Sequence, residues 1–263
     1  MARLSKTERQ QKIIAELQAT PTIRALDLAK DLQVSTETIR RDLEELEAKG
    51  LINRTYGGAS RPLSPDGDVG QREQLFVRER ENIAREVSRF VNHGDVIIIA
   101  GGSTTLHVAR RLAAEKHDLL VVTDSFAVAE TVATNSTIRV QMCPGTYNAR
   151  ERCVFGTDTI NFVERVYANH IILGTSGLTK DGLCSADYDI GSTYSAIIKR
   201  GSAVTVVADH SKIAQTGVHT FASWTEVTRL VTDQPPYDEE LIGSLKLARV
   251  EVVVAQDMWG NGG

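Results

Sequence analysis

The segment of residues 34–50 places the tightest constraint on how this chain can fold. Ser35 is a good N-cap, because its hydroxyl can accept a hydrogen bond from an amide of the first helical turn. Gly50 is a natural helix stop. Three aliphatic residues recur at helical spacing and predict one buried stripe: Ile39, Leu43 and Leu46. The opposite face carries arginines in its first half and glutamates beyond them, as expected for a helix that enters a DNA groove by its N-terminal end.

Residues 1–60 are typical of a winged helix-turn-helix unit, in which three helices precede a β-hairpin. A capping-box pattern at Ser5–Glu8 opens the first helix, and Pro21 ends it. A second short helix follows, with five apolar positions that we expect to be buried: Ile23, Leu26, Leu28, Ala29 and Leu32. Beyond the third helix, residues 51–56 can form a strand and Gly57-Gly58 a tight turn.

The candidate DNA-binding side chains are arginines and hydroxyls. The guanidinium group suits guanine edges or phosphates, and threonine can bond a phosphate or contact a thymine methyl. The candidates are Ser35, Thr36, Thr38, Arg40 and Arg41 on the third helix and Arg54, Tyr56 and Gly57 on the wing. The alternative is that Arg40 and Arg41 only pair with glutamates along a solvated helix. The complete order of three helices and a wing favours DNA binding.

The composition limits the class of protein. A net charge of −4 means that DNA binding depends on the local placement of charge and not on bulk attraction. The three cysteines lack a Cys-x-x-Cys pair, which predicts buried thiols in a reducing compartment and neither disulfides nor a metal site. The N-terminus lacks the apolar segment of a signal peptide, and no apolar run is long enough to span a bilayer. We therefore expect a cytoplasmic protein with no membrane partner, no metal and no cofactor.

The rest of the chain predicts a second domain. Residues 61–74 are expected to be a linker, residues 75–256 an effector domain and residues 257–263 a flexible tail. Within the effector domain, β-branched runs alternate with helical patterns. The seven runs are 96–100, 119–123, 138–142, 170–174, 203–208, 229–232 and 250–255. Continuous apolar strands separated by helices predict an α/β fold with a mainly parallel sheet covered on both faces.

A glycine-rich turn follows the first of these strands. Gly101 and Gly102 precede three hydroxyl residues that open a helix: Ser103, Thr104 and Thr105. Glycines let the backbone approach a ligand, and the amides of the helix start with the hydroxyls can form a phosphate cradle. The alternative is an ordinary strand-to-helix turn. The Gly-x-Gly-x-x-Gly spacing of a dinucleotide site and the lysine of a P-loop are both missing.

Two further strands end in polar residues, and ligands of open α/β sheets bind beyond the carboxyl ends of the strands. We expect these clusters to converge, with Asp124 for sugar hydroxyls and Lys212 as a positive charge. A polar loop of residues 147–152 could close over the ligand and bring an arginine to its phosphate, although a solvated loop is the alternative. The candidate ligand-binding residues are Gly102, Ser103, Thr104, Thr105, Thr123, Asp124, Ser125, Arg152, Asp209 and Lys212.

Two motifs resemble the signature of the DeoR family of bacterial sugar-metabolism regulators. They are Val-Ser-x-x-Thr-Ile-Arg-Arg-Asp-Leu at residues 34–43 and Arg-x-x-Gly-Gly-Ala at residues 54–59. The resemblance extends over the C-terminal half, where it implies a sensor fold related to ribose-5-phosphate isomerase and coenzyme A transferases. Asp124 stands where this family usually has asparagine, and Pro144 where it has glycine. The added carboxylate at Asp124 changes which ligand hydroxyls can be bonded.

These features predict a DNA-binding transcriptional regulator, a repressor of a carbohydrate or polyol catabolic operon, that a phosphorylated sugar releases from its operator. Its expected partners are double-stranded operator DNA, the sugar phosphate and further copies of the chain in a dimer or tetramer. The rival hypothesis is a sugar-phosphate isomerase with an accessory domain, for which Asp124, Asp209 and Lys212 could supply acid and base groups. An activator remains a third possibility, because the sign of regulation depends on where the operator lies. We expect a regulator and not an enzyme.

Overall fold

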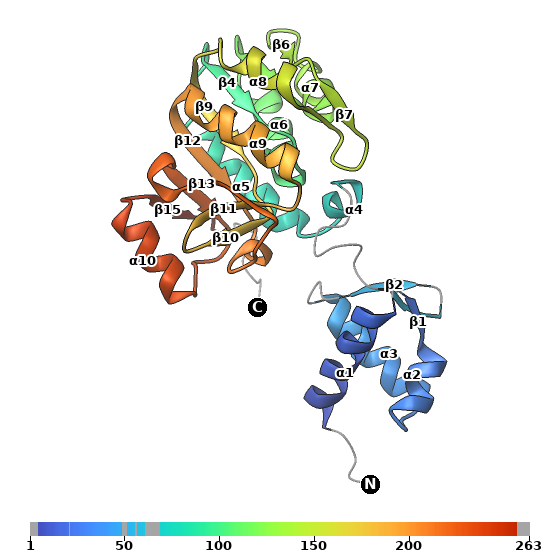
Figure 1. Cartoon of the computed structure of the whole chain (residues 1–263). Helices are drawn as coiled ribbons and strands as arrows, with labels where there is room; N and C mark the ends of the chain where they lie inside the picture. Colours follow the sequence, from blue (N-terminus) through green and yellow to red (C-terminus); the bar gives the residue numbers. More distant parts are fainter. Residues whose placement is uncertain (1–4, 21, 49–51, 56, 61–68, 257–263) are drawn as a thin grey trace. The chain divides into compact units, whose positions relative to one another are not determined.

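The computed structural model divides the chain into two compact units, Met1–Gly67 and Asp68–Gly263 (Figure 1). It describes residues 5–20, 22–48, 52–55, 57–60 and 69–256. Five sequence predictions lie outside the described residues: the helix-ending Pro21, the helix stop Gly50, the wing residue Tyr56, linker residues 61–68 and tail residues 257–263. No helix within the described ranges is both long and apolar enough to cross a membrane.

The N-terminal unit has the predicted winged helix-turn-helix elements. Its helices are α1 (Lys6–Ala19), α2 (Ala25–Asp31) and α3 (Thr36–Ala48). Its strands are β1 (Thr22–Arg24), β2 (Asn53–Thr55) and β3 (Gly58–Ser60), which form an antiparallel sheet in the order β1-β3-β2. The predicted capping box opens α1, since Ser5 and Glu8 each accept a hydrogen bond from the other's backbone amide.

The core of this unit confirms the stripe on α3, because Ile39, Leu43 and Leu46 are all buried against α1 and α2. Two expectations for the second helix were wrong. Leu26 is 55% exposed, and Ile23 lies in strand β1, before the helix begins. Strand β1 explains the second wing glycine, because a Cβ at Gly58 would lie 2.1 Å from the Ile23 carbonyl oxygen.

A buried ion pair joins α1 to α3. The Arg9 guanidinium donates through Nε and Nη2 to the two carboxylate oxygens of Asp42, with the Nη2–Oδ1 distance at 3.0 Å. Asp42 is buried and Arg9 nearly so. The bidentate pair satisfies a carboxylate that would otherwise be buried without a partner, and it fixes the angle at which α1 crosses α3.

The C-terminal unit is built on a seven-stranded parallel sheet with the order β15-β14-β12-β9-β4-β5-β6. The strands are β4 (Val96–Ile99), β5 (Leu120–Thr123), β6 (Arg139–Met142), β9 (Ala168–Leu173), β12 (Gly201–Val207), β14 (Arg229–Thr232) and β15 (Glu251–Val254). All seven predicted strands are present, with ends within two residues of the expected ones. The predicted α/β class and parallel sheet are therefore confirmed.

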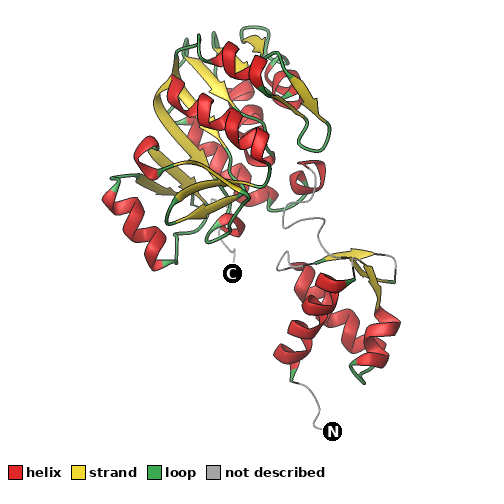
Figure 2. Cartoon of the chain, viewed as in Figure 1, coloured by secondary structure: helices red, strands yellow, loops and turns green. Residues whose placement is uncertain are grey.

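Helices cover both faces of this sheet (Figure 2). Alternate residues of β4 enter two separate hydrophobic clusters: Ile97 and Ile99 pack with α5, α6 and α7, whereas Ile98 packs with α8, α9 and α10. These helices are α5 (Val77–Ser88), α6 (Ser103–Glu115), α7 (Phe126–Val132), α8 (Thr157–Val163), α9 (Tyr188–Ile197) and α10 (Glu239–Leu247). The period-two alternation is the expected consequence of burying a strand on both faces.

Besides strand β1, three features of the C-terminal unit were not predicted. Helix α4 (Val69–Glu73) occupies residues that we expected in the linker, and it belongs to the C-terminal unit. A hairpin of β7 (Thr146–Asn148) and β8 (Cys153–Phe155) contains the loop over residues 149–152. A small antiparallel sheet has the order β10-β11-β13, from β10 (Gly177–Thr179), β11 (Gly182–Ser185) and β13 (His219–Ala222).

The Arg9–Asp42 pair gives a testable prediction about the N-terminal unit. We expect Asp42→Asn to destabilise this unit by about 3 kcal/mol, because it leaves the Arg9 charge largely buried without its partner. The matched control is Glu37→Gln, which breaks an exposed pair with Arg41 and should cost less than about 1 kcal/mol. Hydrogen exchange of α1 and α3 amides would measure both. Equal exchange in the two variants would contradict the prediction.

Candidate functional site

The N-terminal turn of α3 holds its polar residues in fixed positions. The Ser35 hydroxyl accepts a 3.1 Å hydrogen bond from the Thr38 backbone amide, and the two hydroxyl oxygens lie 2.8 Å apart. Ser35 is therefore the predicted N-cap. The two side chains bond each other and remain at least partly accessible, and Thr36 is also partly exposed. The helix start can present hydroxyls and amides to a phosphate. The role of Ser35, Thr36 and Thr38 in DNA binding stays a prediction.

The two arginines of α3 are both exposed but differ in their partners. Arg41 Nε lies 3.6 Å from Glu37 Oε1, one helical turn away, and both side chains are well exposed. Within the described parts of the chain, the Arg40 guanidinium makes no hydrogen bond or ion pair. Of the two arginines, only Arg41 pairs with a glutamate, as the alternative hypothesis requires of both. This pair is exposed to solvent and contributes little to stability. Arg40 can reach DNA without breaking any contact.

The wing arginine is held against α3. Arg54 Nη1 donates to Glu44 Oε1 at 3.1 Å, and its backbone amide donates to Glu47 Oε1 at 3.3 Å. These bonds attach the wing to the acidic half of the helix, so that Arg54 positions the wing in addition to any contact with DNA. Gly57 has a φ of +96°, which explains a glycine at this turn. The role of Arg54 and Gly57 in DNA binding stays a prediction.

The second candidate site lies at the carboxyl edge of the parallel sheet. The strand order reverses at β4, since β5 and β6 continue to one side of it and β9, β12 and β14 to the other. Such a switch point opens a crevice in which the loops after the neighbouring strands diverge. Apart from Thr123, the last residue of β5, and Arg152, in the loop between β7 and β8, the predicted ligand residues follow β4, β5 and β12 in the chain.

The glycine turn after β4 is fixed from both sides. The Gly101 amide donates to Asp124 Oδ1 at 2.7 Å, and the Tyr194 hydroxyl donates to the Gly101 carbonyl at 2.7 Å. A Cβ on Gly101 would lie 3.0 Å from the Cys153 Cβ, and Gly102 has a φ of +153°. Both positions therefore require glycine or nearly so. Sequence reasoning missed Tyr194, because its partner lies 93 residues away.

The hydroxyls at this edge divide into two groups. Three of them are used within the fold: Thr105 donates to the Gly102 carbonyl, Ser125 caps α7, and Thr123 accepts from the Ser125 amide. The hydroxyls of Ser103 and Thr104 make no hydrogen bond to any described residue. These two stand at the start of α6, where the first amides of a helix lack intrahelical partners. They are the hydroxyls best placed to bind a ligand.

Asp209 after β12 is buried in a network of its own. Arg80 of α5 donates to Asp209 Oδ2 through Nε at 3.0 Å and Nη2 at 2.9 Å, and the Ser211 hydroxyl bonds Oδ1. Burial alone would raise the pKa of Asp209, but the charge of Arg80, with Ser211 and Lys212, holds it below its ordinary value. The expected ligand residue Asp209 is therefore committed to Arg80, a residue that sequence reasoning missed. Lys212 lies in the same loop and its charge acts on Asp209.

Asp124 after β5 is also buried, with 1% exposure, but its surroundings differ. Its Oδ1 accepts from the Gly101 amide, whereas Oδ2 is buried without a hydrogen-bond partner among the described residues. Burial raises the pKa of Asp124 to about 7, against the opposing effect of the Gly101 amide. Part of the population therefore has a neutral carboxyl group at neutral pH. A charged carboxylate would repel a phosphate bound nearby, and a partly neutral carboxyl group repels it less.

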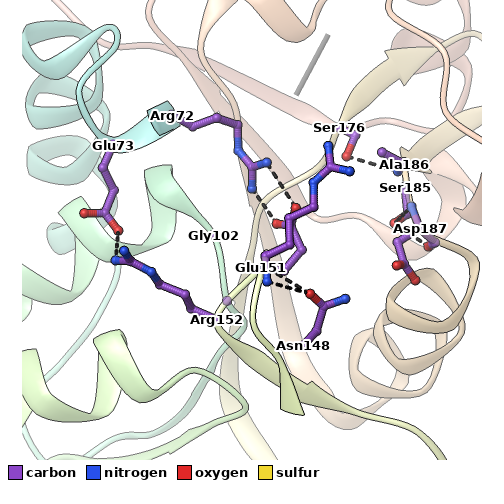
Figure 3. Close-up of polar contacts among 12 residues, drawn as sticks. Arg72, Glu73, Gly102, Asn148, Glu151, Arg152, Ser176, Ser185, Ala186 and Asp187 are labelled. Atoms are coloured by element: carbon purple, nitrogen blue, oxygen red, sulfur yellow. Dashed lines mark hydrogen bonds and ion pairs between the residues drawn. The ribbon is translucent and has the colours of Figure 1, made fainter. Parts of the chain in front are cut away.

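The hairpin loop brings Arg152 to the same edge. Strand β8 is attached to the loop after β5, because the Val154 amide donates to the Asp124 carbonyl at 2.7 Å. Arg152 precedes this strand with a φ of +51°, and its Nη1 lies 3.9 Å from Glu73 Oε1 on α4. Figure 3 shows the Arg152–Glu73 pair, and the Cβ of the next residue, Cys153, lies 3.0 Å from where a Cβ of Gly101 would be. The structure therefore places Arg152 beside the predicted cradle, with a carboxylate as its present partner.

The three thiols and the metal-ligating side chains contribute no further site. Cys143, Cys153 and Cys184 are buried and unpaired, as predicted. Burial, and the nearby Asp124 carboxylate, raise the pKa of Cys143 to about 12. Within the described ranges, no three histidine, cysteine or carboxylate residues are grouped so that they could hold a metal ion.

The shifted Asp124 carboxyl predicts a pH dependence of stability. Because its pKa is raised from 3.8 to about 7 in the folded state, the stabilising neutral form is lost as pH rises through this window. We expect the wild type to lose roughly 3 kcal/mol relative to Asp124→Asn between pH 5 and pH 8. Urea unfolding followed by the fluorescence of the buried Trp224 would measure this difference.

His107 and His170 also make stability depend on pH, and they do so equally in the wild type and in Asp124→Asn. Comparing the two proteins at each pH therefore removes their contribution. Burial lowers the pKa of both histidines, so their stabilising neutral forms are lost in the opposite direction, as pH falls. Parallel pH profiles for the wild type and Asp124→Asn would show that Asp124 is not the titrating group.

Comparisons with known proteins agree in both units. The DeoR-like helix-turn-helix domain matches residues 9–64, and the DeoR C terminal sensor domain matches residues 76–234. The glycerol-3-phosphate regulon repressor of Escherichia coli K12 is 32% identical over 235 residues, covering 89% of this chain and 93% of the relative. The transcriptional repressor GlcR of Bacillus subtilis is 27% identical and covers 88% and 89%.

Similarity to solved structures is weaker. A D-ribose-5-phosphate isomerase in complex with phospho-erythronic acid has 16% identity and a TM-score of 0.38, covering 51% of this chain and 52% of that one. The sequence matches span both the DNA-reading helix and the strand-end loops described above. This chain belongs to the DeoR family of transcriptional regulators.

Proposed function

We propose that this protein is a cytoplasmic repressor of genes for the use of a sugar or polyol, released from its operator by a phosphorylated metabolite. The relatives named as repressors of the glycerol-3-phosphate regulon support a small polyol phosphate as the first effector to test. The observation that carries the proposal is one chain with two sites. One is an exposed helix start with an arginine, and the other is a glycine turn with two hydroxyls; none of these side chains bonds any residue that the structure describes.

The DNA site combines three favourable features on α3. Its N-terminal turn carries the positive end of the helix dipole, Arg40 projects from the same half without a partner in the described structure, and Arg41 is held only by an exposed pair. Two such units in a symmetric oligomer would read two half-sites of an operator. The oligomer is part of the proposal, because a single unit makes too few base contacts for an operator.

The effector site uses the start of α6. Its first amides and the hydroxyls of Ser103 and Thr104 can bond the oxygens of a phosphate, and the helix dipole favours the negative charge. The Asp124 carboxyl stabilises the glycine turn by accepting a hydrogen bond from the Gly101 amide. A phosphate ester is the ligand that this combination of donors fits best.

An isomerase is a poorer interpretation of the same edge. Proton abstraction needs a carboxylate base that can reach the substrate carbon. Both oxygens of Asp209 are bonded to Arg80 and Ser211, and Asp124 is buried beneath the Gly101 backbone. Turnover of ribose 5-phosphate, lost in Asp124→Asn, would restore the enzyme hypothesis.

The DNA-binding part of the proposal predicts the effect of removing Arg40. We expect Arg40→Ala to weaken binding to the upstream DNA of the protein's own gene by about tenfold or more. Fluorescence anisotropy at several salt concentrations would measure it. A salt slope lower by about 1 would assign Arg40 to a phosphate, and an unchanged slope to a base. Arg139→Ala, which removes one exposed arginine from the C-terminal unit, is the control. Equal affinities in the two variants would reject this role of Arg40.

The effector part predicts a selective loss of response. Glycerol 3-phosphate and other sugar phosphates, but not their unphosphorylated parents, should release the protein from DNA. The double variant Ser103→Ala, Thr104→Ala should bind DNA normally and lose this release, because it lacks the two free hydroxyls. Ser202→Ala, at an exposed position on β12, is the matched control. If no phosphorylated compound changes the DNA affinity, the proposed effector class is wrong.

A further inference from the structure

Helix α4 is attached to the hairpin loop by bonds that run in both directions. The Val69 amide donates to the Arg150 carbonyl at 3.1 Å. Arg72 of α4 bonds both carboxylate oxygens of Glu151, at 3.2 and 2.5 Å, and Arg152 of the loop reaches back to Glu73 of α4 (Figure 3). Two adjacent residues of the helix thus form ion pairs with two adjacent residues of the loop, and each segment supplies one arginine and one glutamate.

The hairpin is in turn continuous with the glycine turn. Cys153 forms a bridge with Ser125, and its Cβ lies 3.0 Å from where a Cβ of Gly101 would be. Arg152 is the residue immediately before Cys153. The backbone of Arg152 therefore lies near the start of α6, and its side chain is directed at Glu73.

The two ion pairs differ in strength. Arg72 and Glu151 are largely buried and bonded through two atom pairs, a geometry that resists exchange. Arg152 is half exposed, and its nitrogen lies 3.9 Å from Glu73, beyond hydrogen-bond distance. Glu73 Oε1 is buried without a hydrogen bond among the described residues, although Arg110 also lies 3.9 Å from the other oxygen. The Arg152–Glu73 pair is therefore the weaker link.

We propose that Arg152 is a ligand-binding residue that exchanges Glu73 for a phosphate group at the start of α6, so that effector binding loosens α4. A phosphate offers a guanidinium two short charge-assisted bonds, which the loose pair with Glu73 does not. This proposal rests on the proposed function for the class of ligand. Helix α4 is the first element of the C-terminal unit after residues 61–68, which connect it to the DNA-binding unit in the chain.

The exchange makes ligand binding and the docking of α4 compete for one side chain. By linkage, a change that weakens the Arg152–Glu73 ion pair must raise the affinity for phosphate. Bound phosphate must weaken this ion pair by the same factor. The Arg72–Glu151 pair keeps the helix attached while its other contact changes. The structure therefore supplies a direct route by which a bound anion acts on the segment that leads to the DNA-binding unit.

The test uses the full-length protein and inorganic phosphate as the probe. Hydrogen exchange of residues 69–75 should rise severalfold in the wild type when phosphate is added. Glu73→Gln should bind phosphate about tenfold more tightly, because Arg152 no longer has a competing carboxylate. In Glu73→Gln, the amides of residues 69–75 should show fast hydrogen exchange without phosphate, and adding phosphate should not raise the rate further. Arg152→Ala should weaken phosphate binding about tenfold or more and should remove the response of α4.

Glu164→Gln, which removes one exposed carboxylate beside α8, controls for the change in net charge. Equal phosphate affinities in Glu73→Gln and Glu164→Gln would overturn the proposed swap of Arg152 from Glu73 to phosphate. An unchanged rate of hydrogen exchange in residues 69–75 of the phosphate-bound wild type would overturn it as well. Either result leaves the proposed function intact if a sugar phosphate still releases the protein from DNA. Failure of every sugar phosphate to release DNA, with α4 still responding, would overturn the proposed function alone.

Discussion

The buried pair of Arg80 and Asp209 organises the carboxyl edge of the sheet. It joins α5 to the loop after β12, and the remaining nitrogen of Arg80 donates to the Arg72 carbonyl at the end of α4. Two charges inside a protein are tolerated only when each is fully bonded, so neither residue can change alone without leaving an unpaired charge. Through this contact α5, the Asp209 loop and the end of α4 are joined to one another.

The two buried aspartates at this edge show how the surroundings assign different tasks to the same side chain. Asp209 has a guanidinium partner and a lowered pKa, and it acts as a fixed anion that holds Arg80. Asp124 has no cationic partner among the described residues, its Oδ1 accepts from the Gly101 amide, and burial raises its pKa to about 7. A carboxyl group that is partly neutral can stand beneath a phosphate site at a small electrostatic cost. The departure from asparagine at this position therefore does not exclude an anionic ligand.

Local pattern was sufficient to predict much of the fold. The β-branched runs predicted all seven parallel strands, and the helical stripe predicted α3 and its buried face, because both depend on residues close in sequence. The contacts that fix the sites could not be found in this way. Arg9 pairs with Asp42 over 33 residues and Arg80 with Asp209 over 129. Helix α4 has five residues, too few to form without tertiary contacts, so its sequence resembles a linker.

The division of charge along α3 explains how an acidic chain can read DNA. Asp42 bonds Arg9, Glu45 bonds Lys6 and Gln10, and Glu44 and Glu47 bond Arg54. These four carboxylates, which follow Arg41 in the helix, are thus paired with α1 and the wing, and they stabilise the unit. Arg40 and the positive helix end remain at the other half. With a net charge of −4, bulk attraction to DNA is weak, so the proposed DNA affinity must come from local groups such as these.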